Sequence, residues 1–174
     1  LSGSTSQEEM LCRESNLYNI LMRFNTSYYK ENREDGSGCM YRNRALYVPD
    51  VQFVNHEEIN AADVIVCASP NYIATKRLGI EDPAWNSVCL SARISFIFDV
   101  AEAEKVDCLV LGAFGCGAFG QTAEEVAEQM FYEMKHHNIP HIIYAVPDYQ
   151  SRNYIVFEEA DRKEKAAEAV RKSE

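Results

Sequence analysis

The pattern of hydrophobic and polar positions predicts a chain that begins with a helix and continues through alternating strands and helices. Apolar residues recur at helical spacing over 11–22, with room for a break near Ser15. Ser6 or Thr5 can cap this helix, because a glutamate follows each of them three residues later. Residues 25–44 are polar and rich in turn-forming types, so they predict a loop.

The rest of the chain repeats a strand–helix order. Strands are expected at 45–49 and 51–54, on either side of a Pro-Asp turn, and at 63–68, 108–111 and 142–146. Helices are expected to begin at Asp82-Pro83, at Thr122 and near Asn153. The apolar runs at 63–68 and 108–111 suit strands covered on both faces. This order predicts an α/β protein with three α/β/α layers and a mixed, largely parallel sheet, as a single domain over 1–174.

Composition and charge exclude several classes of binding partner. Seventeen basic and 27 acidic residues leave a net charge of -10, and no basic stripe is visible, so direct nucleic-acid binding is not expected. No apolar run reaches the roughly 18 residues that a membrane helix needs. The six cysteines are scattered, with no zinc-binding spacing, and are interpreted as buried, reduced thiols of a cytoplasmic protein. Neither a metal nor a cofactor is expected.

A glycine-rich segment, Leu111 to Gly120, lies between a predicted strand and a predicted helix. Four glycines let the backbone approach a ligand closely, and the helix N-terminus that follows favours an anion. The segment therefore predicts a phosphate or diphosphate cradle that uses no Lys or Arg, although a tight turn packed with aromatics would have the same composition. It lacks the P-loop pattern, and its G-x-G-x-x-G has no acidic residue at the spacing of a dinucleotide site. Cys116 could be a nucleophile, but no catalytic histidine pairs with it clearly, so a small packed residue is favoured.

The triplet Gln7-Glu8-Glu9 falls in the first turn of the first predicted helix. Carboxylates there commonly serve only as capping and dipole groups. A catalytic interpretation is constrained by geometry, because adjacent helical side chains diverge and cannot flank one bond from opposite sides. One carboxyl would have to act alone as general acid and then base, while the other holds a substrate hydroxyl.

Together these features resemble a known family. Residues 7–18, QEEMLCRESNLY, resemble the Q-E-E-x-L-C-R-x-S-x-L-Y signature of the bacterial-type poly(ADP-ribose) glycohydrolases, a branch of the macrodomain fold. Residues 45–51 resemble the family's A-L-Y-S-P-D-V, and residues 63–71 its strand ending in A-P-N, with Ser69 where alanine is usual. Residues 111–120 resemble L-G-A-F-G-C-G-A-F-G.

The resemblance implies a macrodomain-like fold and hydrolysis of ADP-ribose glycosidic bonds without a metal. Glu9 would be the catalytic acid/base, Glu8 would hold a ribose hydroxyl at the scissile linkage, and Gln7 would support the pair. The implied substrate-binding residues comprise the diphosphate loop with a ribose-facing aromatic, and two positions near the adenosine end: Gly115, Cys116, Gly117, Ala118, Phe119, Gly120, Asn153 and Phe157.

The chain departs from the family at its front. The family carries a glycine triplet and strands before Q-E-E, whereas this sequence starts at Leu1, without Met. We therefore expect the C-terminal portion of a glycohydrolase that binds ADP-ribose or poly(ADP-ribose). There are three alternatives: hydrolysis of mono-ADP-ribose from protein or another acceptor, ADP-ribose binding without turnover, and an inactive fragment that persists as an assembly.

Overall fold

A computed structural model describes residues 6–55, 58–147 and 151–171. They form two compact units, Leu1–Ala68 and Ser69–Glu174. Each unit combines helices with one pair of strands, antiparallel in the first and parallel in the second. The α/β class and the mixed strand directions predicted from the sequence are confirmed. The single domain over 1–174 stays a prediction.

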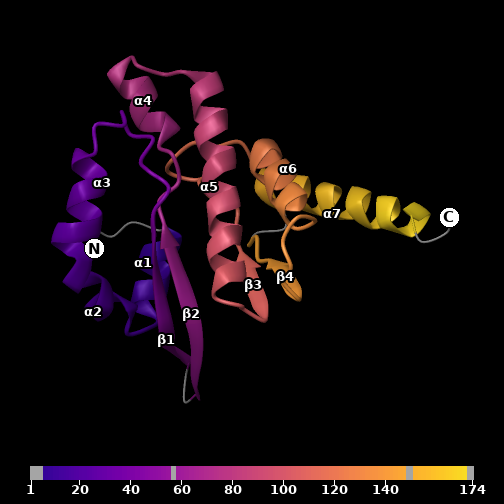
Figure 1. Cartoon of the computed structure of the whole chain (residues 1–174), viewed down its shortest axis with the longest axis horizontal. Coiled ribbons are helices and arrows are strands. Elements are labelled where there is room, and N and C mark those ends of the chain that lie inside the picture. The colour runs from indigo at the N-terminus through magenta and orange to yellow at the C-terminus, as the bar shows by residue number, and fades with distance from the viewer. Residues whose placement is uncertain (1–5, 56–57, 148–150, 172–174) are drawn as a thin grey trace. The chain divides into compact units, whose positions relative to one another are not determined.

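The first unit combines short helices with a long antiparallel strand pair (Figure 1). Its elements are α1 (Gln7–Arg13), α2 (Leu17–Leu21), the 3-10 helix η1 (Met22–Phe24), the π-helix η2 (Asn25–Tyr29), α3 (Lys30–Glu34), β1 (Ala45–Asn55) and β2 (Glu58–Cys67). The break predicted near Ser15 is confirmed. The Ser15 hydroxyl donates to the carbonyl of Leu11 at 2.6 Å and accepts the N–H of Leu17 at 3.1 Å, so it ends α1 and starts α2.

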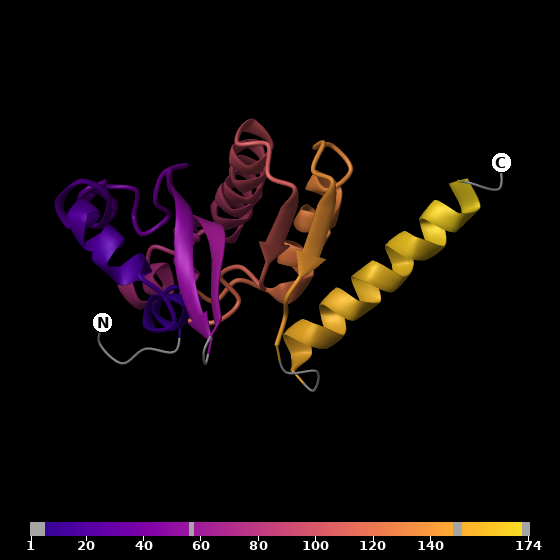
Figure 2. The same cartoon turned by 90° about the horizontal axis from the view of Figure 1, so that it is seen from below.

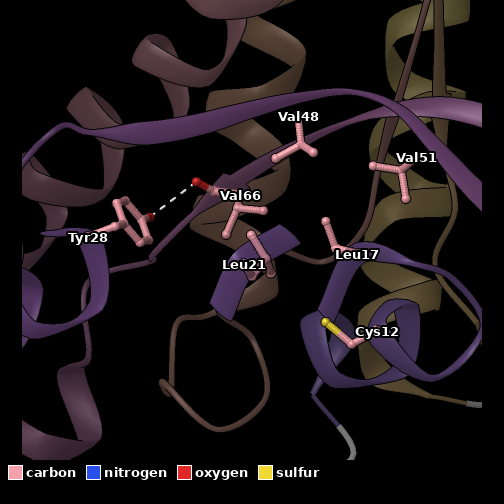
Figure 3. Close-up of a cluster of buried hydrophobic side chains, with 7 residues drawn as sticks. All are labelled: Cys12, Leu17, Leu21, Tyr28, Val48, Val51 and Val66. Atoms are coloured by element: carbon pink, nitrogen blue, oxygen red, sulfur yellow. Dashed lines mark hydrogen bonds between the residues drawn. The ribbon is translucent and has the colours of Figure 1, made fainter. Parts of the chain in front are cut away.

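The loop predicted for residues 25–44 is wrong over 25–34, which are helical in η2 and α3. The cause is tertiary packing rather than local propensity. Tyr28 is buried in the core, and its hydroxyl donates to the carbonyl of Val66 at 3.1 Å (Figure 3). The core around it is an apolar cluster drawn from α1, α2, η2 and both strands: Cys12, Leu17, Leu21, Tyr28, Val48, Val51 and Val66.

Strand β1 is continuous where two strands and a turn were expected. The β1–β2 register shifts between Val48 and Val51, so the Pro49-Asp50 pair forms a β-bulge instead of a turn. Asp50 adopts a left-handed φ of 55°, and the Asp63 carboxylate of β2 accepts its N–H at 2.8 Å. Strand β2 is also more exposed than expected, since Val66 is its one buried residue.

The second unit combines helices with a short parallel strand pair (Figure 2). Its elements are α4 (Tyr72–Leu78), α5 (Pro83–Ala103), β3 (Cys108–Leu111), α6 (Ala123–Glu133), β4 (His141–Tyr144) and α7 (Arg152–Arg171). Helix α6 packs against both α5 and α7. The predicted helix starts are confirmed: the side chain of Asp82 accepts the N–H of Trp85 at 2.9 Å, and that of Thr122 accepts the N–H of Glu125 at 3.4 Å.

Burial corrects two expectations, one for strand β3 and one for the cysteines. In β3, Leu109 and Leu111 are buried while Cys108 and Val110 are exposed, so this strand is covered on one face and not on both. Cys12 is the one buried cysteine, whereas Cys108 is exposed. All six cysteines lie within the described residues and are free thiols.

None of the helices that the structure describes is long and apolar enough to cross a membrane.

Candidate active site

The first candidate group lies on α1, which begins at Gln7. Ser6 occupies the N-cap position, but its side chain makes no capping hydrogen bond, so the capping box expected there does not form. The alternative cap, Thr5, lies outside the described residues. Gln7 is exposed, whereas Glu8 and Glu9 are half-buried, and the Oε2 atom of Glu9 is fully buried. Burial of part of this carboxylate pair sets it apart from freely solvated charges at a helix start.

The environment of Glu8 favours its protonated form. Burial raises the pKa of the Glu8 carboxyl, the Tyr29 hydroxyl lowers it in part, and the negative charge of Glu9 raises it further. Burial and the neighbouring Glu8 in turn raise the pKa of Tyr29. Sequence reasoning missed Tyr29, because this residue lies in the segment predicted as a loop.

The second candidate group is the glycine loop between β3 and α6. Gly115 and Gly120 have left-handed φ values of 75° and 73°, a conformation that L side chains rarely adopt. A Cβ atom on Gly115 would lie 2.2 Å from Oγ of Ser69, and one on Gly120 would lie 2.5 Å from Cγ1 of Ile73. Glycine is therefore required twice in six residues. Around a Cβ placed on Gly117, by contrast, there is open space.

Hydrogen bonds hold this loop in a compact turn. The N–H of Cys116 donates to Ala113 at 3.1 Å, that of Gly120 to Gly117 at 3.2 Å, and that of Gln121 to Gly115 at 3.0 Å. The N–H of Ile73 also donates to the carbonyl of Phe119 at 3.2 Å. The exposed part of the turn is Gly117-Ala118, and Phe119 beside it is half-buried. The turn ends at the capped N-terminus of α6, where a positive partial charge favours an anion.

The environment of Cys116 opposes the nucleophile interpretation. Burial, and after it the charge of Glu124, raises the pKa of the Cys116 thiol to about 11. Reactive cysteines have a lowered pKa, because the thiolate is the nucleophile. Cys116 is half-buried in the loop, and its contact with the substrate stays a prediction.

Asn153 and Phe157 lie on α7, in the same unit as the glycine loop. Asn153 is half-buried and Phe157 is buried, with its ring centroid 5.7 Å from that of Tyr144. Phe157 therefore packs against Tyr144 in the core of this unit. The adenosine contacts of both residues stay predictions.

The structure adds residues that sequence reasoning missed. Ser69, Asn86 and Gln121 are buried and polar, and they lie beneath the glycine loop. The available signal was the position of Gln121 directly after the last loop glycine. Across the described ranges, no three His, Cys, Asp or Glu side chains are grouped so that they could hold a metal ion.

Comparison with known proteins gives one family. Residues 1–56 match the model of the catalytic domain of microbial-type PARG, that is, poly(ADP-ribose) glycohydrolase. No curated protein sequence matches the chain.

Solved structures match over nearly the whole chain. The glycohydrolase of Deinococcus radiodurans in complex with ADP-ribose superposes with a TM-score of 0.85 at 25% identity, over 93% of this chain and 70% of that one. The enzyme of Thermomonospora curvata bound to the inhibitor ADP-HPD gives a TM-score of 0.77 at 26% identity, over 91% of this chain and 63% of that one. The apo enzyme of Deinococcus radiodurans gives 0.80 at 25% identity, over 92% and 71%. The resemblance found in the sequence is thus confirmed: the chain is similar to the microbial-type poly(ADP-ribose) glycohydrolases, in sequence over residues 1–56 and in fold over most of its length.

Proposed function

We propose that this protein hydrolyses the ribose–ribose O-glycosidic bond of poly(ADP-ribose) and releases ADP-ribose. The observation that carries the proposal is the glycine loop. Its two left-handed glycines leave no room for a side chain, and it leads directly into the capped N-terminus of α6. A similar fold holds ADP-ribose in the Deinococcus radiodurans glycohydrolase. The loop is thus suited to receive the diphosphate through its backbone.

In this proposal Glu9 is the catalytic acid/base. Its carboxyl gives a proton to the departing ribose oxygen as the bond to the anomeric carbon breaks. It then takes a proton from the water that adds to the oxocarbenium-like centre. Glu8 holds a ribose hydroxyl, and Gln7 supports the pair. The mechanism uses no metal.

The remaining contacts follow the family resemblance. Gly115 to Gly120 wrap the diphosphate, with Cys116 packed inside the turn and Phe119 against the ribose next to the cleaved bond. Asn153 and Phe157 face the adenosine end. The protein thus binds ADP-ribose alone or at the end of a polymer.

The test compares wild type with Glu9→Gln, and uses Glu14→Gln as control. Glu14 lies at the exposed C-terminal end of the same helix, so this change removes one charge from α1 outside the proposed site. We expect wild type and Glu14→Gln to release ADP-ribose from the polymer. Glu9→Gln should lose at least about 100-fold in rate, the scale of general acid–base catalysis, while calorimetry finds its ADP-ribose affinity unchanged.

Three outcomes would contradict the proposal. Binding of ADP-ribose without release by wild type would indicate a binding module. Release from mono-ADP-ribosylated protein but not from the polymer would indicate a mono-ADP-ribosyl hydrolase. Equal rates for Glu9→Gln and Glu14→Gln would remove Glu9 from the chemistry.

A further inference from the structure

A buried polar network lies directly beneath the glycine loop. Gln121 follows the last loop glycine and is 5% exposed, while Asn86, in the first turns of α5, is 4% exposed. Their amides form a reciprocal pair: Asn86 Nδ2 donates to Gln121 Oε1 at 2.9 Å, and Gln121 Nε2 donates to Asn86 Oδ1 at 3.0 Å. Gln121 Nε2 also donates to the carbonyl of Pro70 at 2.7 Å, and the Ser69 hydroxyl donates to the same oxygen at 3.2 Å.

This network satisfies groups that would be costly to bury alone. An unsatisfied buried amide or carbonyl destabilises by the full desolvation penalty, so the four groups depend on one another. Gln121, whose side chain joins these groups, is also part of the end of the loop. Its N–H donates to the carbonyl of Gly115 at 3.0 Å. Gln121 is thus bonded to the loop through its backbone and to α5 and Pro70 through its side chain.

The packing under Gly115 agrees with this arrangement. The Cβ position of Gly115 is closed off by Oγ of Ser69 at 2.2 Å and by Cγ of Gln121 at 2.8 Å. The main chain of the loop therefore rests directly on two members of the network. A shift of either side chain must move the loop backbone or open a void beneath it.

We infer that the Asn86–Gln121 amide pair is a positioning device that holds the Gly115–Gly120 loop in its phosphate-receiving conformation. This inference rests on the proposed function, because a preformed loop would increase the affinity for the diphosphate of ADP-ribose. A loop that adopts its binding conformation only part of the time binds more weakly in proportion to that fraction. Neither residue touches the reacting atoms in this account.

The first experiment needs no ligand. Hydrogen–deuterium exchange of the loop amides is compared between wild type, Gln121→Leu and the control Gln129→Leu. Gln129 lies on α6, where its side chain donates to Glu133, so the control makes the same change away from the loop. We expect exchange at Cys116, Gly120 and Gln121 to rise by roughly tenfold in Gln121→Leu, with α7 and the control unchanged. Unchanged loop exchange would overturn the inference, whether or not ADP-ribose binds.

The second experiment uses Gln121→Glu as a rescue by protonation. A neutral carboxyl there can still accept from Asn86 and donate to Pro70, whereas a carboxylate cannot donate, and burial raises the pKa of such a group. We expect ADP-ribose affinity at pH 8 to be at least about tenfold below wild type and to recover as the pH falls to 5. The control Gln52→Glu, which changes an exposed side chain of β1, should follow wild type throughout.

The second experiment also separates the inference from the proposed function. Absence of ADP-ribose binding by wild type would overturn the proposed function, and the loop exchange would still decide whether the amide pair holds the loop. Wild-type binding together with an affinity of Gln121→Glu that stays equal to wild type at pH 8 would overturn the amide pair alone.

Discussion

At the residue scale, two glycines of the second unit differ in what an alanine would meet: backbone strain alone, or backbone strain together with a steric clash. Gly79, at the C-cap of α4, has a left-handed φ of 67° and open space around its Cβ position. Gly120 has nearly the same φ, but a Cβ atom there would lie 2.5 Å from Ile73. Alanine at Gly79 therefore meets backbone strain alone, whereas alanine at Gly120 meets strain and a steric clash.

We expect Gly79→Ala to lower the free energy of unfolding by about 1–2 kcal/mol and Gly120→Ala by about 2–5 kcal/mol. Denaturant unfolding of both variants beside wild type measures the difference. Equal losses would show that Ile73 moves aside without cost, and the close approach beneath the loop would then carry no constraint.

At the element scale, helix ends with a clear chemical signal could be predicted and contacts distant in sequence could not. Asp82 and Thr122 mark the starts of α5 and α6 because a cap acts on amides three residues away. The helical segment 25–34 has no such local signal. It is stabilised by the bond from Tyr28 to Val66, 38 residues away. A local pattern does not report a partner that far along the chain.

His137, four residues after the end of α6, contacts α5 and has a charge that responds to pH. The ring of His137 contacts the carbonyl oxygen of Glu133 at 3.0 Å and the carboxylate of Asp99, on α5, at 3.1 Å. Burial lowers the pKa of His137, but the Glu133 carbonyl and the carboxylates of Asp99 and Glu133 outweigh it, so the pKa is raised overall.

A raised pKa means that the folded state favours the imidazolium. Its stabilisation is complete below the unfolded value of about 6.5 and is lost as the pH rises through the folded pKa. We expect His137→Gln to cost about 0.5–1 kcal/mol near pH 5.5 and less near pH 9. Unfolding free energies across this range measure it, with His136→Gln as the control, because the His136 ring contacts Tyr132 near the end of α6. A cost of His137→Gln that grows with pH would contradict the assignment.

At the scale of the whole molecule, the sequence sufficed for the α/β class, the order of the main elements and the motifs of the candidate site. The faces of β2 and β3 were misjudged, because β-branched composition does not tell whether one or two layers cover a strand. Ser69, Asn86 and Gln121 were missed since their significance arises only when three separate segments meet.

The net charge of -10 leads to a prediction for the whole protein. Proteins that hold phosphates with Lys and Arg lose about 10³–10⁵ in affinity between 50 and 200 mM salt. Here an acidic protein meets an anionic polymer, so added salt screens a repulsion. We expect the affinity for poly(ADP-ribose) to change less than about threefold over that range, or to rise. A loss of tenfold or more, measured by calorimetry at several salt concentrations, would place basic side chains in the binding surface.

The exposed tip of the glycine loop, Gly117-Ala118, presents peptide groups and almost no side chain. Alanine-scanning mutagenesis removes no side-chain group there. Other single substitutions would report the effect of added side-chain volume and not the contribution of the backbone amides. The informative perturbation is replacement of one amide by an ester in semisynthetic protein, which deletes a hydrogen-bond donor and keeps the side chains.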